Sequence, residues 1–216
     1  MKYFLFLLLF INSTILYSQL NSSRKIQKSA QNSTSELNKI MGISNLNFVL
    51  GDYLSIKDHP KSREVNLEIK VPVGWEVKEG DRPNVVKKFV NNGNSYVISI
   101  KENATFFTRK QIKKALEEDD FAKDLVKELT LYLITPQLIN QSIVSIDSYP
   151  ALQFRFKAKF ERMGLILPII MNSWIIFYED KIIFLQSLRF DTPELIILEQ
   201  LYSSITNSVI LPEQFK

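Results

Sequence analysis

The clearest pattern in this chain is the alternation of apolar and polar residues over positions 152–160. Every second residue there is Leu, Phe or Ala, and the residues between them are Gln, Arg and Lys. This period of two predicts a long antiparallel strand with one face in water. Residues 65–71 alternate in the same way, and residues 48–56 predict an earlier strand that is broken at Gly51.

Two pairs of strand-like runs are separated by short polar turns and therefore predict hairpins. The first pair joins residues 85–91 to 95–101, and the second joins 173–178 to 181–190. Asn92-Gly93 is a strong turn signal in the first hairpin, because both central residues of a tight two-residue turn need a positive φ.

Helical spacing follows the first hairpin and closes the chain. Thr108 and Gln111 match a capping box, and apolar residues then recur at helical spacing over 112–116 and 121–129. Thr192-Pro193 predicts the start of a last helix, since proline is favoured at the first helical position. Strand runs and helix runs are segregated along the chain. This order predicts an α+β fold, with a central antiparallel sheet covered by helices.

The order of these elements resembles the Mog1/PsbP-like fold. Residues 71–75, Val-Pro-Val-Gly-Trp, resemble the strand-ending P-x-G-W of that fold, and Tyr149-Pro150-Ala151 enters a strand at the matching place. The resemblance extends over residues 46–212 and implies an α/β/α sandwich in an exported bacterial protein. Named members of the fold are an extrinsic photosystem subunit and a protein that binds a small GTPase. No residue-by-residue match carries either role to this chain.

The first residues predict export. Lys2 is followed by an apolar run over residues 3–11 and by a small residue at Ser18, which are the parts of a secretory signal peptide over residues 1–18. The run is too short for a membrane span, which needs about 20 apolar residues, so no stable span is expected after cleavage. An uncleaved anchor helix over residues 3–20 is the alternative. The expected location is the periplasm or the surrounding medium.

The predicted domain organisation has two further parts. Residues 19–45 are rich in Ser, Asn, Gln and Lys and predict a polar tether that is partly helical or disordered. Residues 46–216 form a single predicted α+β domain, which is long enough to build a full core. Trp75 and Trp174 are expected to lie in that core.

Composition narrows the chemistry. The 216 residues include no cysteine, which excludes disulfides, a thiolate metal site, a thiol nucleophile and a cysteine-linked lipid anchor. A formal net charge of +4 is too weak to predict nucleic-acid binding, which needs a clustered basic face. The sequence contains no G-x-S-x-G, no H-E-x-x-H and no Gly-rich phosphate loop. We therefore expect no cofactor and no metal.

The titratable groups give no catalytic pattern. His59 is the only histidine and lies in the polar segment 57–61, where it is expected to be a loop residue. A histidine base would need an orienting acid and a nucleophile beside it. The acidic residues 117–120 lack the ligand spacing and turn glycine of a calcium loop, so they are expected to be a solvated helix start.

Two neighbouring features are candidates for a binding surface. Basic residues line the polar face of the long strand, and residues 165–171 are apolar without alternation and contain Pro168, which places the strand at an edge or a bulge. A solvated sheet face and a buried strand are the plain interpretations. The alternative is a contact surface for a protein or lipid partner. Its residues would be Arg155, Lys157, Lys159, Arg162, Leu165, Leu167 and Ile169.

The sequence favours an exported, non-enzymatic binding or accessory module whose ligand is not identified. One alternative is a hydrolase-type enzyme that uses carboxylates, and another is a subunit of a cell-envelope assembly held by the tether. A surface pocket that gathers two or more acids with a basic residue would favour the enzyme. The oligomeric state stays open at this point.

Overall fold

The computed structural model describes residues 49–91, 94–117, 125–127, 129–130, 133–162, 165–192 and 197–212. The predicted signal peptide, the tether, the turn at Asn92-Gly93 and most of the acidic segment 117–120 lie outside the described residues. They stay predictions, as do the domain boundaries. Within the described part of the chain, no helix is long and apolar enough to cross a membrane.

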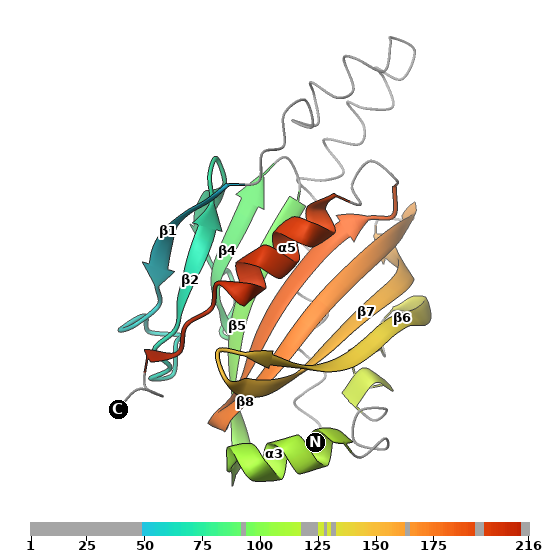
Figure 1. The fold of residues 1–216 in the computed structure, drawn as a ribbon. Helices are drawn as coiled ribbons and strands as arrows, with labels where there is room; N and C mark the ends of the chain where they lie inside the picture. Colours follow the sequence, from blue (N-terminus) through green and yellow to red (C-terminus); the bar gives the residue numbers. More distant parts are fainter. Residues whose placement is uncertain are drawn as a thin grey trace.

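Most of the described chain belongs to one antiparallel sheet (Figure 1). Its strand order is β3-β4-β5-β8-β7-β6. The strands are β3 (Glu76–Glu79), β4 (Val85–Asn91), β5 (Asn94–Phe107), β6 (Ile134–Ile146), β7 (Tyr149–Arg162) and β8 (Leu165–Phe190). A separate two-stranded sheet joins β1 (Leu50–Ser55) to β2 (Glu68–Pro72), and a bridge from Glu68 to Ile210 ties it to the C-terminal segment.

Strand β8 folds back on itself. Its first part pairs with β7 and its second part pairs with β5. The backbone N–H of Asp191 donates to the carbonyl of Pro168 at 3.1 Å, and the side chains of Asn172 and Ser187 meet at 3.3 Å across the two arms. Glu179 has a φ of 54° where the chain reverses. The second predicted hairpin is therefore confirmed.

Helices α3 (Arg109–Glu117) and α5 (Leu198–Asn207) pack against opposite faces of the sheet. The predicted capping box of α3 is present, because Thr108 N–H donates to the side chain of Gln111 at 3.0 Å and Gln111 N–H donates to Thr108 Oγ1 at 3.3 Å. Figure 1 shows α5, in red, lying across the strands.

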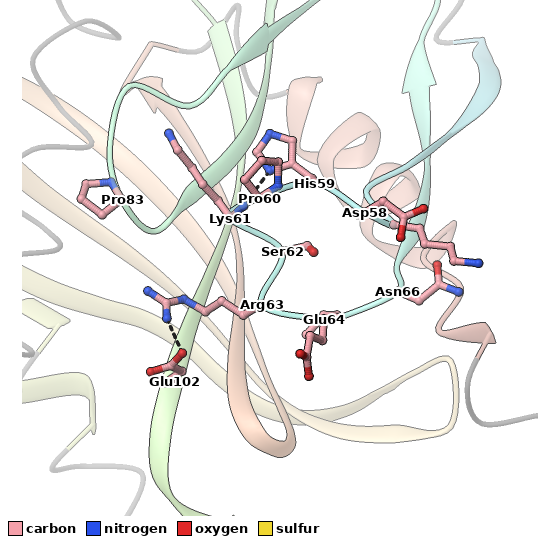
Figure 2. A pocket seen from close by; sticks show the side chains of 12 residues that line it. Asp58, His59, Pro60, Lys61, Ser62, Arg63, Glu64, Asn66, Pro83 and Glu102 are labelled. Atoms are coloured by element: carbon pink, nitrogen blue, oxygen red, sulfur yellow. Dashed lines mark hydrogen bonds and ion pairs between the residues drawn. The ribbon is translucent and has the colours of Figure 1, made fainter.

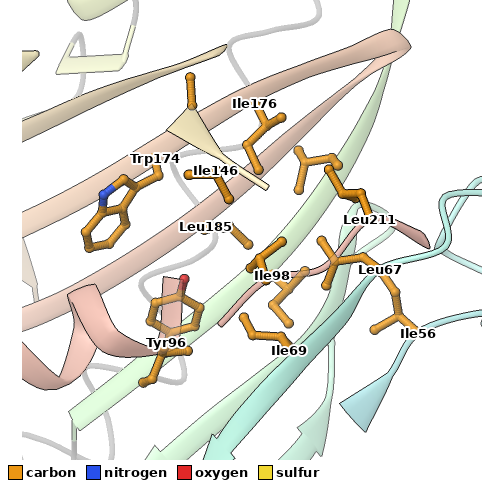
Figure 3. Packing of buried hydrophobic residues seen from close by; sticks show 14 of the residues in the cluster. Ile56, Leu67, Ile69, Tyr96, Ile98, Ile146, Trp174, Ile176, Leu185 and Leu211 are labelled. Carbon is orange, nitrogen blue, oxygen red and sulfur yellow. The ribbon is translucent and has the colours of Figure 1, made fainter. Parts of the chain in front are cut away.

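Alternate residues of β8 supply the two cores. Trp174 and Ile176 pack with α5 and β2, whereas Ile175 and Phe177 pack with Ile112 of α3. Figure 3 shows side chains from β2, β5 and β8 converging in the first of these cores. Buried aromatic rings reinforce it: the Tyr96 ring stacks on those of Phe89 and Tyr202, and the Trp75 ring meets Tyr202 edge-on. Both tryptophans lie in or against the core, as predicted.

The observed class is mainly antiparallel sheet with few helices, which agrees with the coarse prediction. Two strands were not predicted. Strand β3 is short and exposed, and β6 is exposed along most of its length. Since neither strand buries one clean face along its length, neither shows a clear alternation of apolar and polar residues.

Candidate functional site

The segment 56–67 joins β1 to β2 as a tightly held loop. Its backbone makes three successive hydrogen bonds between residues three apart, from His59 N to Ile56 O, from Ser62 N to His59 O and from Val65 N to Ser62 O, at 2.8–3.1 Å. Ile56, Val65 and Leu67 are buried in the core. Because both ends of the loop are anchored by buried apolar side chains, the polar residues between them are held in one arrangement.

The loop contains left-handed backbone at three residues that are not glycine. Asp58 has a φ of 63°, Arg63 of 52° and Glu64 of 68°. A residue with a side chain costs on the order of 1–3 kcal/mol in such a conformation, and it persists only where the surroundings enforce it. Strain of this kind gathers at functional sites, which makes the loop a candidate on backbone grounds alone.

His59 joins the loop to the start of the main sheet. Its Nε2 lies 2.8 Å from Glu79 Oε2, and its Nδ1 accepts a hydrogen bond from Lys61 N–H at 3.1 Å. Glu79 also accepts a hydrogen bond from Lys87, and these two basic partners lower the pKa of the Glu79 carboxyl to about 2. Both ring nitrogens of His59 are therefore engaged. His59 lies in a loop, as predicted, and its acidic partner is Glu79 rather than the adjacent Asp58.

Arg63 anchors the other side of the loop. Its Nη1 lies 2.6 Å from Glu102 Oε1 of β5, and its Nη2 donates to Asn84 Oδ1 at 3.0 Å. Lys61 adds a third attachment, because its ammonium group donates to the carbonyl of Gly80. The loop is thus tied to β5 and to the β3–β4 turn by charged side chains.

The loop borders an open pocket of about 620 Å³. Residues 57–66 line it together with Pro83 and Glu102. Figure 2 shows the loop as an arc, with Asp58 and Asn66 at one side and the Arg63–Glu102 ion pair at the other. The lining has three basic and three acidic side chains, which are Lys57, Lys61, Arg63, Asp58, Glu64 and Glu102.

The lining of this pocket is mostly polar and charged. Among the described residues of the pocket, Ser62 and His59 are linked only through their backbones, so they form no nucleophile–base pair. The pocket does gather three carboxylates beside basic groups. An enzyme that uses carboxylates was expected to have a pocket of this kind. Glu102, one of the three, is held in an ion pair with Arg63. No group of three or more potential metal ligands occurs in the described ranges.

The predicted basic row lies elsewhere, on the α5 face of β7. The Arg155 guanidinium donates to Glu199 of α5, and Lys157 Nζ lies 2.6 Å from Asp191. Lys159 is exposed. Two of the three basic side chains are therefore partnered within the chain.

Two of the predicted apolar residues, Leu167 and Ile169, do not share the face of that basic row. The register pairs Lys157 with Ile170 and Lys159 with Pro168, so the even-numbered residues of the apolar run share the face of the row. Ile169 pairs with Ala158 and is fully buried, so its side chain is not exposed for the contact that the sequence suggested. Leu167 is half-buried, with the same parity as Ile169.

The remaining two predicted contacts concern the end of the β7–β8 pair. Leu165 pairs with Arg162, and the side chains of both lie outside what the structure describes. Ile166 is exposed on the face of the row, although the prediction did not include it.

Comparison with known proteins finds solved structures of similar fold. No family model matches the chain, and no curated protein matches it. The solved structure of the Ran-binding protein Mog1p of Saccharomyces cerevisiae matches at 10% identity and a TM-score of 0.48, over 76% of this chain and 96% of that one. The PsbP protein of Synechocystis sp. PCC 6803, CyanoP, matches at 14% identity and a TM-score of 0.45, over 78% and 97% of the two chains.

A third solved structure, from Bacteroides thetaiotaomicron VPI-5482, matches at 12% identity and a TM-score of 0.44. The match covers 69% of this chain but only 46% of that protein, so this chain spans less than half of its length. At such identities and scores, none of these matches carries an argument about function. Solved structures of the Mog1/PsbP-like type are among those that this chain is similar to, as the order of its elements indicated.

Proposed function

We propose that this protein is an exported, non-enzymatic binding module whose binding site is the pocket of the 56–67 loop. The observation that carries the proposal is the strained, multiply anchored loop around a pocket with equally many basic and acidic side chains. A rigid polar site loses little conformational entropy on binding. The balance of charge suits a small ligand or a chain segment that carries both a cationic and an anionic group.

Export and the complete fold belong to the same proposal. Cleavage after Ser18 would release the domain into the periplasm or the medium, with residues 19–45 as a lead-in. The full domain would be an α/β/α sandwich, with α3 and α5 as part of the two outer layers. Detection of the protein in the periplasm or medium of its host tests the export, and its intact mass tests the cleavage; protein found only in the cytoplasm, or a mass that retains residues 1–18, would contradict the respective part.

Binding can be measured with dipeptides, because they carry both charges and their composition can be varied. We expect Lys-Glu to shift backbone NMR resonances of residues 57–66, and the variant Lys57→Gln/Glu64→Gln to lose this response while remaining folded. Lys78→Gln is the matched control, because Lys78 is an exposed lysine on β3 outside the pocket. If neither Lys-Glu nor a wider set of zwitterionic dipeptides perturbs the loop, the proposed site is wrong.

A carboxylate-using hydrolase is the second candidate, and the three carboxylates of the pocket favour it. The test is hydrolysis of a panel of chromogenic glycosides and esters, with Asp58→Asn and Glu64→Gln as the variants. Turnover that either variant abolishes would establish an enzyme. Turnover that survives both would assign the activity to a contaminant or to another part of the chain.

A third candidate keeps the lipid or partner surface that the sequence suggested, with revised residues. Lys159, Pro168 and Ile166 lie on one face of the β7–β8 pair, and all three are exposed. Apolar and basic side chains side by side suit an anionic membrane surface or an envelope partner. Co-sedimentation with vesicles of phosphatidylglycerol tests it, because binding should fall in Ile166→Ser and Lys159→Gln. Vesicles that bind the wild type and both variants alike would contradict it.

A further inference from the structure

Strand β6 (Ile134–Ile146) forms one outer edge of the main sheet. It pairs with β7, and no other described strand pairs with it. Its 13 residues would extend over roughly 43 Å at about 3.3 Å per residue. The strand contains no Asp, Glu, Lys, Arg or His, and Leu138, Ile139 and Ile143 are exposed on it.

The other outer edge of the same sheet has the opposite character. Strand β3 has only four residues, and three of them, Glu76, Lys78 and Glu79, are charged. Short length and charge are the devices by which proteins prevent an edge strand from pairing with another chain. The sheet therefore protects the β3 edge and leaves β6 long, uncharged and partly apolar.

The irregular part of β6 is confined to its first half. Pro136 lies there, and the pairing with β7 shifts register between Ile134 and Gln137 and again between Leu138 and Asn140. From Asn140 to Ile146 the register runs without a break. Only this second half has the regular backbone that a further strand needs in order to pair along it.

We infer that this protein forms a symmetric dimer in which β6 pairs antiparallel with β6 of a second copy, with the two-fold axis near Ile143. A two-fold axis brings each residue opposite a residue of the same segment, so any charge near the axis would face an equal charge. The complete lack of ionisable groups in β6 removes that repulsion. Ile143 then meets the partner's Ile143, an apolar cross-strand pair. A strongly charged peptide would find no complementary charge on this edge, which is why a second copy is the fitting partner.

Sedimentation velocity of the purified protein tests the dimer. We expect dimers at micromolar concentration and at least about tenfold weaker association in Ile143→Lys, because two ammonium groups then face each other across the axis. Val77→Lys is the matched control, since it places the same charge at an exposed apolar residue of β3, the opposite edge of the sheet. An equimolar mixture of Ile143→Lys and Ile143→Glu should recover the dimer. A wild type that stays monomeric, or an Ile143→Lys variant that dimerises as the wild type does, would overturn the inference.

Crosslinking then locates the axis. The chain has no cysteine, so a single introduced thiol reports only its own position. Residues opposite each other in an antiparallel pair have Cα atoms about 4.5–5.5 Å apart, within the range that a disulfide spans. Ile143→Cys should therefore form covalent dimers under mild oxidation, and Val77→Cys on the opposite edge should not. Equal crosslinking of the two variants would show random collision and would refute an axis at Ile143.

Discussion

The substitution Glu199→Gln tests the ion-pair cluster under α5 most directly. Glu199 Oε1 accepts hydrogen bonds from two guanidinium groups, those of Arg155 and Arg189, and lies 3.1 Å from Nε of Arg189. The Arg189 side chain is only 3% exposed, whereas Glu199 is 20% exposed. A single carboxylate thus balances two arginines, one of which is almost completely removed from water.

The expected loss of stability follows from the charge left behind. Removing one partner of a buried ion pair costs about 3–5 kcal/mol, because the remaining charge is desolvated without compensation. Arg189 keeps hydrogen bonds to the carbonyls of Phe190 and Thr192, at 2.9 and 3.4 Å, and Glu199 is partly solvated. We therefore expect the lower end, about 3 kcal/mol. This is a large share of the roughly 5–15 kcal/mol that stabilises a typical domain.

Urea denaturation measures this loss. With a slope of about 2 kcal/mol per molar urea, the midpoint should fall by about 1.5 M. The double variant Arg189→Met/Glu199→Leu should regain most of the loss, since replacing a whole buried pair by apolar groups is often neutral. A fall of less than about 1 kcal/mol in Glu199→Gln, or a double variant less stable than the single one, would show that the cluster does not behave as a buried ion pair.

Three further predictions concern other contacts. Tyr96 OH lies 2.7 Å from Thr206 Oγ1 in the core. The Thr206 hydroxyl already donates to a backbone carbonyl, so Tyr96 is the donor. Tyr96→Phe should lower the free energy of unfolding by about 1 kcal/mol in urea denaturation, and no loss would contradict this hydrogen bond. A Cβ at Gly80 would lie 1.8 Å from the carbonyl oxygen of Val85. Gly80→Ala should therefore lower the free energy of unfolding by at least about 2 kcal/mol and lower the melting temperature. An unchanged melting temperature would disprove the close approach. Because the pKa of Glu79 is lowered from 4.5 to about 2, its stabilisation is present above pH 4.5 and is lost as the pH falls toward 2. Glu79→Gln should therefore be slightly less stable than the wild type at pH 7 and nearly equal to it at pH 2. The difference should be small because Glu79 is exposed, and a difference that persists undiminished at pH 2 would contradict the assignment.

Sequence periodicity predicted those elements whose burial follows their local pattern. The alternation over residues 152–160 became β7, the capping box at Thr108 begins α3, and the runs around Glu179 became the two arms of β8. Apolar side chains of all three elements are buried in the cores, so local sequence and tertiary packing agree. Strand β6 lacked such a set because it is a mostly exposed edge, held by backbone pairing with β7.

The candidate sites were harder to predict, for two separate reasons. The predicted contact surface joined basic and apolar residues that are neighbours in the sequence. Side chains alternate between the two faces of a strand, however, so Ile169 lies in the core and Ile166 is exposed. In the loop pocket, the left-handed backbone occurs at Asp58, Arg63 and Glu64, and no glycine marks it in the sequence. The ion pairs that hold the loop join residues about 20 to 40 positions apart, a distance that no local pattern encodes.

The loop pocket and β6 lie far apart in the sheet, so ligand binding in the pocket and dimerisation through β6 can be tested separately. A dimer would also affect how two pockets bind together. The pocket is lined from the β1–β2 loop, the β3–β4 turn and β5, whereas β6 lies at the opposite edge of the main sheet. A dimer through β6 would leave both pockets accessible, one at each outer end of a continuous sheet. Two linked sites bind a surface that displays many ligands far more tightly than one site does, by about 10²–10⁴ where the geometry allows both to engage. Ile143→Lys should then keep the wild-type affinity for a free dipeptide and lose affinity only for the same dipeptide immobilised at high density. Loss of both would show that β6 also supports the pocket, and loss of neither would show that the dimer has no part in binding.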